Sequence, residues 1–266
     1  MTNGHESAAR CIAAAVSAGA LGLASAPAAA VSPVDPGDYT GLPGGTTGGL
    51  LCYKHITADD VYANGKKVVG NLDFKLELGA LRGVHYMSWG SGLFAVDALQ
   101  LFGKQESGLL HQSVAGVGDF KLAVHYWAIH DLKNNEHLGA PLRLVAPTGT
   151  KADQGFALSD NRWALNPGVG YIRNLAAKIS LDLAAQLESY GNNRDTKATR
   201  DLVSYIDTSL RYHLDAGSSL SATYRHTWGG SEELGGVTLA DKRDNGTLVL
   251  GWEKFLTKQV QLSLRY

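Results

Sequence analysis

The stretch Lys178-Ile-Ser-Leu-Asp-Leu-Ala-Ala-Gln-Leu-Glu188 alternates apolar and polar residues along its whole length. The odd positions from Ile179 to Leu187 are apolar, whereas most even positions carry a charged or polar side chain. A helix would place Asp182 among the leucines, but a strand puts the polar groups on one face because successive side chains point to opposite sides. The stretch therefore predicts a β-strand with one apolar and one polar face.

The same alternation returns along most of the chain, and clusters of Asn, Asp and Gly that are typical of turns lie between the segments. The predicted strands are 49–57, 92–102, 117–130, 136–147, 161–174, 177–189, 201–214, 217–229, 243–255 and 257–266. The stretch 70–89 reads either as one long strand or as two, and two strands give the even total that is usual in bacterial barrels. We therefore predict an all-β fold of about twelve antiparallel strands, with about ten strands as the alternative.

The composition excludes several classes of protein. The chain has 266 residues, with 24 Lys and Arg against 25 Asp and Glu, and only 18% of the residues are charged. A net charge near zero provides no basic surface for nucleic acid, so we expect no nucleic-acid partner. The two cysteines, Cys11 and Cys52, cannot form a disulfide framework.

Residues 1–30 have the features of a secretory signal peptide. Residues 11–24 form an apolar core rich in Ala, Leu and Val, and the small residues 25–30 contain an Ala-x-Ala pattern. A short membrane anchor is the alternative, but this core is shorter than a spanning helix requires. We predict export and cleavage after this segment. A Pro- and Gly-rich periplasmic or plug-like segment at 31–48 and a barrel at 49–266 then follow.

Two architectures fit the alternation: a soluble sandwich that turns the apolar face inward, and a transmembrane barrel that turns it outward into lipid. Three features favour the barrel. Charged residues fall in the middle of strand after strand, and the chain ends with an alternating strand that carries Tyr266. The predicted strands also match the roughly nine to eleven residues that cross a bilayer. Together with the signal peptide, they predict a single antiparallel β-barrel in the bacterial outer membrane. A soluble periplasmic β-protein is the alternative.

Aromatic residues recur on the predicted apolar faces, many of them near strand ends. Such rings favour the headgroup zone and form girdles at both surfaces of a membrane, although they are also ordinary core residues of a sandwich. The rings assigned to this face are Tyr86, Tyr126, Trp163, Tyr171, Tyr212, Tyr224, Trp228, Trp252 and Tyr266. We expect outer-membrane lipid as one partner of the chain. A second is the barrel assembly machinery, which we expect to recognise Tyr266 in the last strand as an assembly signal.

The polar face of each strand is predicted to line the lumen. By parity the lumen-lining residues are Lys75, Glu77, Lys121, His125, Arg143, Asp182, Glu188, Asp207, Arg211, Arg225 and Arg265. A barrel of about twelve strands has a wider interior than an eight-stranded one, whose interior is filled by side chains. We therefore expect a small, mildly cationic pore with internal ion pairs. The alternative role for each charge is to stabilise the barrel by pairing across strands.

Short motifs are spread along residues 33–266. They are Pro33-Val-Asp-Pro-Gly-Asp-Tyr39-Thr-Gly-Leu-Pro43, Leu51-Cys-Tyr-Lys-His55, Tyr62-Ala-Asn-Gly-Lys-Lys67, Gly116-Val-Gly-Asp-Phe120, Leu144-Val-Ala-Pro147-Thr-Gly149-Thr, Asn161-Arg-Trp163, Gly170-Tyr171 and Tyr224-Arg-His-Thr-Trp228-Gly-Gly230. Each motif is short, but their order and spacing together are specific, and they resemble those of the meta-pathway of phenol degradation family of bacterial outer-membrane β-barrels. The resemblance implies a channel or transporter-like barrel that passes small aromatic or hydrophobic solutes. No catalytic or binding residue is carried over from it.

The sequence holds no familiar motif for catalysis or metal binding. The patterns H-E-x-x-H, C-x-x-C, G-x-S-x-G and the P-loop are absent, so we predict no catalytic residue, no metal ligand, no cofactor and no enzyme. An outer-membrane hydrolase is one alternative; His226 falls on the predicted lipid face, but Ser221 is too far along the strand to pair with it. A non-transporting structural or adhesin-like barrel is the other alternative.

Overall fold

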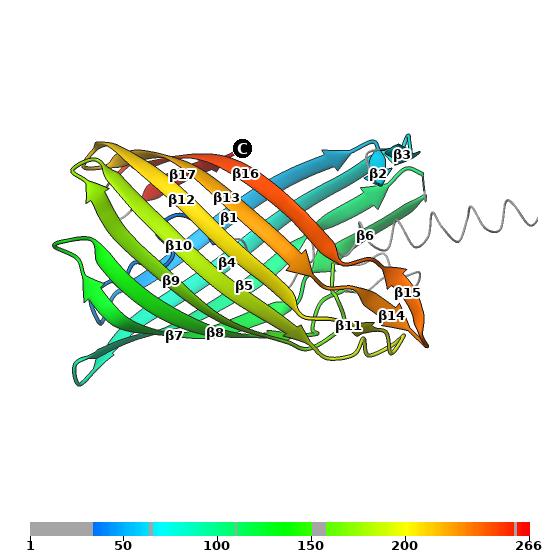
Figure 1. Cartoon of the computed structure of the whole chain (residues 1–266), viewed down its shortest axis with the longest axis horizontal. Helices are drawn as coiled ribbons and strands as arrows, with labels where there is room; N and C mark the ends of the chain where they lie inside the picture. Colours follow the sequence, from blue (N-terminus) through cyan, green and yellow to red (C-terminus); the bar gives the residue numbers. More distant parts are fainter. Residues whose placement is uncertain (1–33, 64–65, 110, 151–157, 258–259) are drawn as a thin grey trace, which may run out of the picture.

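The computed structural model describes residues 34–63, 66–109, 111–150, 158–257 and 260–266, and the predicted signal peptide lies outside these ranges. Within them the protein is all-β, as the alternation predicts. No helix in the part of the chain that the structure describes is long and apolar enough to cross a membrane. Figure 1 shows long strands wound side by side into one curled sheet, with short strands gathered at one end.

One antiparallel sheet contains twelve strands. In spatial order it comprises β1 (Thr47–Ala58), β4 (Phe74–Trp89), β5 (Gly92–Ser107), β7 (Phe120–Asp131), β8 (Glu136–Ala146), β9 (Ala164–Ala176), β10 (Ile179–Tyr190), β12 (Val203–Asp215), β13 (Ser218–Gly229), β16 (Arg243–Phe255) and β17 (Gln261–Arg265), with β6 (Gln112–Val117) paired to β5. The short strands outside this sheet are β2 (Val61–Ala63) and β3 (Lys66–Val69), which pair with each other, and β11 (Thr199–Arg200), β14 (Glu232–Leu234) and β15 (Val237–Ala240), which form a three-stranded sheet.

The strand count agrees with the prediction, but the chain is divided differently. The stretch 70–89 contributes one long strand, because β4 pairs with β5 without a break from Phe74 to Trp89, so the expected division into two strands is wrong. The additional strand is β6. It pairs with β5 next to β7, and the two are separated only by Gly118 and Asp119. Because β6 and β7 share one place across the sheet, the sheet is eleven positions wide.

β1 and β17 are the two edges of the sheet. β1 pairs with β4 along its twelve residues, whereas β17 pairs with β16 over five. Because neighbouring strands alternate in direction, the first and the eleventh positions run the same way, and no ladder joins them among the described residues. Tyr266 exchanges backbone hydrogen bonds of 2.9 and 2.8 Å with Leu250. It therefore lies beside the middle of β16 rather than at the end of the barrel (Figure 1).

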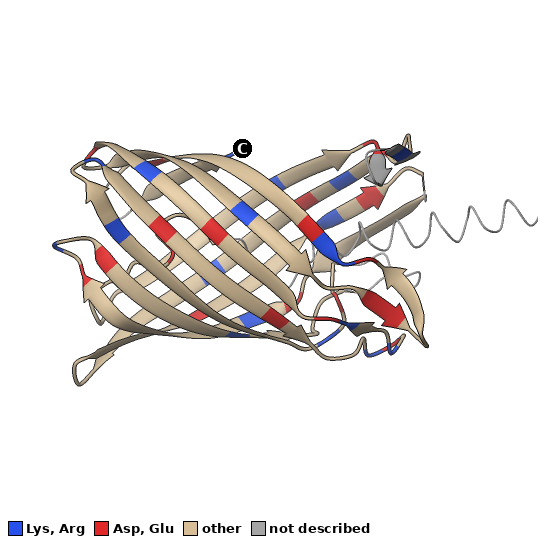
Figure 2. Cartoon of the chain, viewed as in Figure 1, with Lys and Arg blue, Asp and Glu red and all other residues tan. Residues whose placement is uncertain are grey.

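The two faces of the sheet have opposite polarity. On β10, Asp182 and Glu188 are buried on the inner face, whereas Leu183 and Leu187 on the outer face are 39% and 44% exposed. Most of the long strands repeat this arrangement, and Figure 2 shows charged residues within the strands as well as in the loops. An apolar exterior around a polar interior is the reverse of a soluble core and is typical of a transmembrane barrel. The predicted fold is confirmed.

Most of the aromatic residues assigned to the outer face lie there, but Tyr86 does not. Trp163 and Tyr224 are each 50% exposed, as expected for rings in contact with lipid. Tyr86 is buried on the inner face, where its ring lies 5.3 Å from that of Trp127. The assignment of Tyr86 is wrong because the even-numbered residues of β4 face inward, which the sequence alternation of this strand does not reveal.

Candidate functional site

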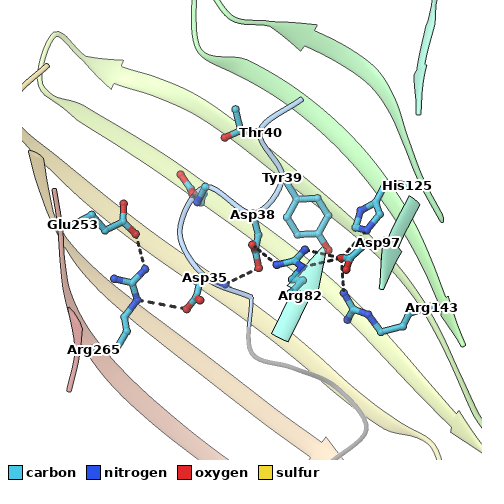
Figure 3. Close-up of polar contacts among 12 residues, drawn as sticks. Asp35, Asp38, Tyr39, Thr40, Arg82, Asp97, His125, Arg143, Glu253 and Arg265 are labelled. Atoms are coloured by element: carbon cyan, nitrogen blue, oxygen red, sulfur yellow. Dashed lines mark hydrogen bonds and ion pairs between the residues drawn. The ribbon is translucent and has the colours of Figure 1, made fainter. Parts of the chain in front are cut away.

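A coil segment lies inside the curled sheet and forms the centre of the candidate site (Figure 3). We call residues 34–46 the plug segment. It begins with a tight turn in which Asp38 N donates to Asp35 O at 3.0 Å and Gly37 adopts a φ of +90°. Pro36 followed by Gly37 suits a type II turn, because proline presets the first central residue and glycine permits a positive φ at the second. The local sequence thus bends the chain so that it fits inside the barrel.

Charged contacts hold the turn of the plug segment to opposite walls. Asp38 accepts a hydrogen bond from Arg82 Nη1 on β4 at 2.9 Å, and Asp35 lies 3.4 Å from Arg265 Nε on β17. The backbone N–H of Gly37 donates to Asp182 Oδ2 on β10 at 2.6 Å. The plug segment therefore spans the interior and is fixed from several sides.

Tyr39 is the main apolar anchor of the plug segment. Its ring is buried against Ile172 and Ala184, and its backbone oxygen accepts a hydrogen bond from Trp127 Nε1 at 2.8 Å. The amide Nε2 of Gln186 lies 3.5 Å from its hydroxyl oxygen. Burial raises the pKa of Tyr39 to about 12, so the side chain is a neutral phenol at physiological pH.

The plug segment joins β1 through pairing with β4. Gly45 N donates to Tyr86 O, and Tyr86 N donates to Thr46 O, both at 2.8 Å. Between these bonds and Tyr39, Gly41 N donates to His137 Nδ1 on β8 at 3.3 Å. The segment is thus tied to the wall along its length, and its covalent continuation is the first strand of the sheet.

A cluster of charges lies beside Tyr39 on the wall formed by β4, β5, β7 and β8. One oxygen of Asp97 lies within 2.9 Å of two Arg82 nitrogens, 3.3 Å from His125 Nε2 and 4.0 Å from Arg143 Nη2. Sequence reasoning predicted His125 and Arg143 but missed Arg82 and Asp97. The sequence did contain a signal for this cluster. Asp97 is the one charged residue in an apolar stretch of β5, and a carboxylate in such surroundings needs a partner.

The inner face contains nine of the predicted lumen-lining residues. Lys121, His125, Arg143, Asp182, Glu188, Asp207, Arg211, Arg225 and Arg265 all have low exposure. Several of them pair with neighbours on adjacent strands. Arg225 donates to both oxygens of Asp207 at 2.6 and 2.9 Å, and Arg211 donates to Asp182 at 3.1 Å. These pairs make the interior polar and balance part of its charge.

Lys75 and Glu77 do not line the lumen, and their assignment is wrong. Both are exposed on the outer face of β4, and Lys75 pairs with Asp73 at 2.9 Å. The alternating residues Phe74 and Leu76 face inward instead, where they belong to an apolar cluster with Leu72, Val114 and Leu158. Leu158 comes from the segment after β8 and covers this part of the interior. At this end of the barrel the apolar side of the strand is therefore the inner one.

A cluster of four charged residues joins the loops at the end of the barrel where the short strands lie. The sequence analysis missed these residues, which are Asp160, Arg162, Arg200 and Glu232. Arg200 pairs with both Asp160 and Glu232, and Arg162 Nη2 lies 2.7 Å from Glu232 Oε1. Although burial opposes ionisation, the two guanidinium groups lower the pKa of Glu232 below its usual value. The residues come from three loops far apart in sequence, so no local pattern predicts the cluster.

The two residues considered for a hydrolase site, Ser221 and His226, lie on opposite faces of the sheet. Ser221 is buried on the inner face of β13, whereas the ring of His226 lies beside Trp228, which is on the outer face. His226 pairs with Asp244 at 3.1 Å. Within the described ranges, no group of three or more His, Cys, Asp or Glu side chains is arranged to hold a metal ion.

The curled antiparallel sheet, its apolar exterior and its polar interior define the class of protein: a transmembrane β-barrel with a chain segment inside. The family model described as "Putative MetA-pathway of phenol degradation" matches residues 57–266, and the chain belongs to this family. The resemblance seen in the motifs is confirmed. An outer membrane channel from Pseudomonas putida F1 has a similar crystal structure, with 31% sequence identity and a TM-score of 0.82 over 88% of this chain and 91% of that chain. No curated protein matches.

Proposed function

We propose that this protein is a channel in the bacterial outer membrane that passes small aromatic or hydrophobic compounds. The observation that carries the proposal is the plug segment, a stretch of coil held in a polar interior by hydrogen bonds and ion pairs. Passage then depends on displacement of this segment. The similarity to the P. putida channel supports channel activity, and the description of the family supports aromatic cargo. The predicted signal peptide supports export.

The inner wall beside the plug segment suits solutes that are largely apolar but carry a polar group. Tyr86, Leu93, Ala95 and Trp127 form a buried apolar cluster on the inner face. Next to it lies the charged cluster around Asp97. Binding sites for small organic molecules combine mostly apolar walls with a few polar groups in fixed positions. The two clusters provide an apolar wall and fixed polar groups within one part of the lumen.

The start of β1 provides a pivot for the plug segment. Gly45 has a φ of +88°, and a Cβ at this position would meet nothing within 4 Å. Glycine adopts such a conformation without strain and tolerates a change of backbone angles. We expect the segment to swing about Gly44 and Gly45 while β1 stays in the sheet.

Planar-bilayer recording of the purified full chain tests the proposal. The wild-type protein is compared with a variant in which residues 35–42 are replaced by a Gly-Ser chain of equal length. We expect a small conductance for the wild type and a conductance several times larger for the variant, because the lumen is then unblocked. Heat-modifiable gel mobility verifies that both proteins are folded. Two folded proteins without conductance would refute the channel and favour the non-transporting structural barrel.

A further inference from the structure

The ring of Tyr39 fills a hollow in the barrel wall. Gly139 on β8 pairs directly with Gly170 on β9, which pairs with Ala184 on β10, so three small residues form one row across the inner face. A Cβ built on Gly170 would lie 2.3 Å from the Tyr39 ring, and one on Gly139 would lie 3.3 Å from it. The hollow therefore exists because two adjacent positions have no side chain.

The polar end of this hollow contains a hydrogen-bonding group without a partner. Gln186 is only 5% exposed, and its Oε1 has no hydrogen-bond partner among the described residues. Its Nε2 reaches the hydroxyl oxygen of Tyr39 only at 3.5 Å, the limit of a hydrogen bond. Buried amide oxygens are nearly always partnered, so Oε1 indicates a missing donor.

Tyr39 does not supply this donor in the structure, and its backbone is fixed. Trp127 Nε1 holds its carbonyl oxygen at 2.8 Å, and the neighbouring Asp38 is bound to Arg82. Small cavities border the ring on two sides, one toward Gln186 and Pro141 and the other toward Ala184 and Ser209. A free ring has no backbone tether, so it can shift within this space until its hydroxyl reaches the amide.

We propose that the hollow is a binding site for a free single-ring phenol, and that Tyr39 occupies it as an internal substitute for that ligand. The proposal rests on the proposed channel function, because a phenol reaches the hollow through the lumen. Gly139 and Gly170 admit the flat ring, Ile172 provides apolar contact, and Gln186 Oε1 accepts a hydrogen bond from the hydroxyl group. The site takes the neutral form of the phenol, which is also the form of the buried Tyr39 side chain.

Tyr39 and a free phenol compete for the same place. A group held next to its site by its own chain competes at a high effective concentration. A free phenol therefore binds weakly to the wild-type protein and more tightly once the Tyr39 ring is removed. A ring that keeps its place but lacks the hydroxyl should still block the site.

Binding of 4-fluorophenol to the purified full chain in detergent, followed by fluorine NMR, tests this competition. We expect Tyr39→Ala to bind the probe saturably and at least ten times more tightly than the wild type. Tyr39→Phe should bind it as weakly as the wild type, since the ring remains. Tyr53→Ala is the matched control, because Tyr53 is a tyrosine on the outer face of β1 with 70% exposure. Equal binding by Tyr39→Ala and the wild type, with both proteins folded, would overturn the proposal.

Two further variants locate the bound probe. On the Tyr39→Ala background, Ala184→Leu fills the hollow from β10 and should reduce binding at least tenfold. Gln186→Leu on the same background should remove the preference for 4-fluorophenol over 4-fluorotoluene, because the hydroxyl then has no acceptor. If Ala184→Leu leaves the binding unchanged, the probe binds elsewhere and the assignment of the hollow is wrong.

Planar-bilayer recordings of the same preparations separate this proposal from the channel proposal. Conductance without probe binding in Tyr39→Ala would refute the phenol site and leave the channel intact. Probe binding without conductance in any plug variant would refute the channel, and with it the role of the hollow in transport.

Discussion

One carboxylate oxygen of Asp97 accepts two hydrogen bonds from Arg82, at 2.9 Å from Nε and 2.7 Å from Nη2. The remaining nitrogen of this guanidinium, Nη1, donates to Asp38 of the plug segment at 2.9 Å. Asp97 thus orients Arg82 within the wall, and Arg82 in turn holds the plug. Removal of Asp38 separates the plug from the wall and leaves the Arg82–Asp97 pair in place.

We expect Asp38→Ala to open the channel more often than the wild type. A hydrogen bond to a charged group contributes about 1.5–3 kcal/mol, so its loss shifts the docking equilibrium of the plug by roughly tenfold or more. Single-channel recording measures the open probability. Asp241→Ala is the control, because Asp241 is an exposed acid in the loop before β16. An open probability equal to that of the control would show that Asp38 does not hold the plug.

The Asp207–Arg225 pair on the inner face should stabilise the barrel rather than the plug. Their side chains are 4% and 13% exposed, and two hydrogen bonds join them. Removing one partner of a buried ion pair costs about 3–5 kcal/mol because the other charge is left uncompensated. Asp207→Ala should therefore lower the unfolding midpoint in urea, and Asp207→Ala combined with Arg225→Leu should restore part of it. A double variant less stable than the single one would contradict this reading.

The alternation of the sequence was sufficient to predict the class of fold and the membrane-facing surface. It did not predict which face of β4 is the inner one. Lys75 and Glu77 look like lumen residues by parity, but Phe74 and Leu76 face inward and pack with Leu158 from a distant loop. This packing leaves no trace in the local pattern.

The plug segment shows the same limit of sequence reasoning. Its Pro and Gly content predicted a segment that enters the lumen or lies at its mouth, but its partners are far away in the chain. Gly37 contacts Asp182 across 145 positions, and Asp35 contacts Arg265 across 230. Most of the charged residues on the inner face could be found by parity one strand at a time, whereas the hollow around Tyr39 required the alignment of three strands.

The loop cluster around Glu232 predicts a dependence of loop order on pH. The pKa of Glu232 is lowered in the folded protein, so its contribution to stability is complete above its ordinary value of 4.5 and is lost as the pH falls through the lower folded value. Below this range Arg162 and Arg200 lose a shared partner. Hydrogen exchange in β11 and β14, corrected for the intrinsic effect of pH, should then increase.

Glu232→Gln is the matched variant for this effect. Already at neutral pH, hydrogen exchange in β11 and β14 of this variant should be roughly tenfold faster than in the wild type. This factor corresponds to a loss of about 1.5 kcal/mol from the charged hydrogen bonds of Glu232. Its exchange should also change little on acidification. Glu233→Gln is the control, because Glu233 is the neighbouring exposed acid. A Glu232→Gln protein that keeps the full pH dependence would assign the effect to another group.

Substitutions of Tyr266 can separate two roles of this residue. The predicted role is an assembly signal, for which the aromatic ring itself matters. The structure adds a second consideration, because Tyr266 lies beside Leu250 at half height and the residue is 99% exposed. At that depth, a charged residue facing lipid destabilises a barrel by up to about 2–4 kcal/mol, and less for Asp than for Arg or Lys.

We therefore expect Tyr266→Asp to reduce the amount of folded protein in the outer membrane under either role. Tyr266→Leu discriminates between them, because it keeps an apolar side chain and the backbone hydrogen bonds to Leu250 but removes the ring. A marked loss of heat-modifiable protein in Tyr266→Leu would support recognition of the ring by the assembly machinery. Wild-type levels would show that contact with lipid is sufficient and that Tyr266 is not the signal. Arg211→Ala removes one partner of an inner-face ion pair but keeps Tyr266, so it should leave assembly largely intact in the same experiment.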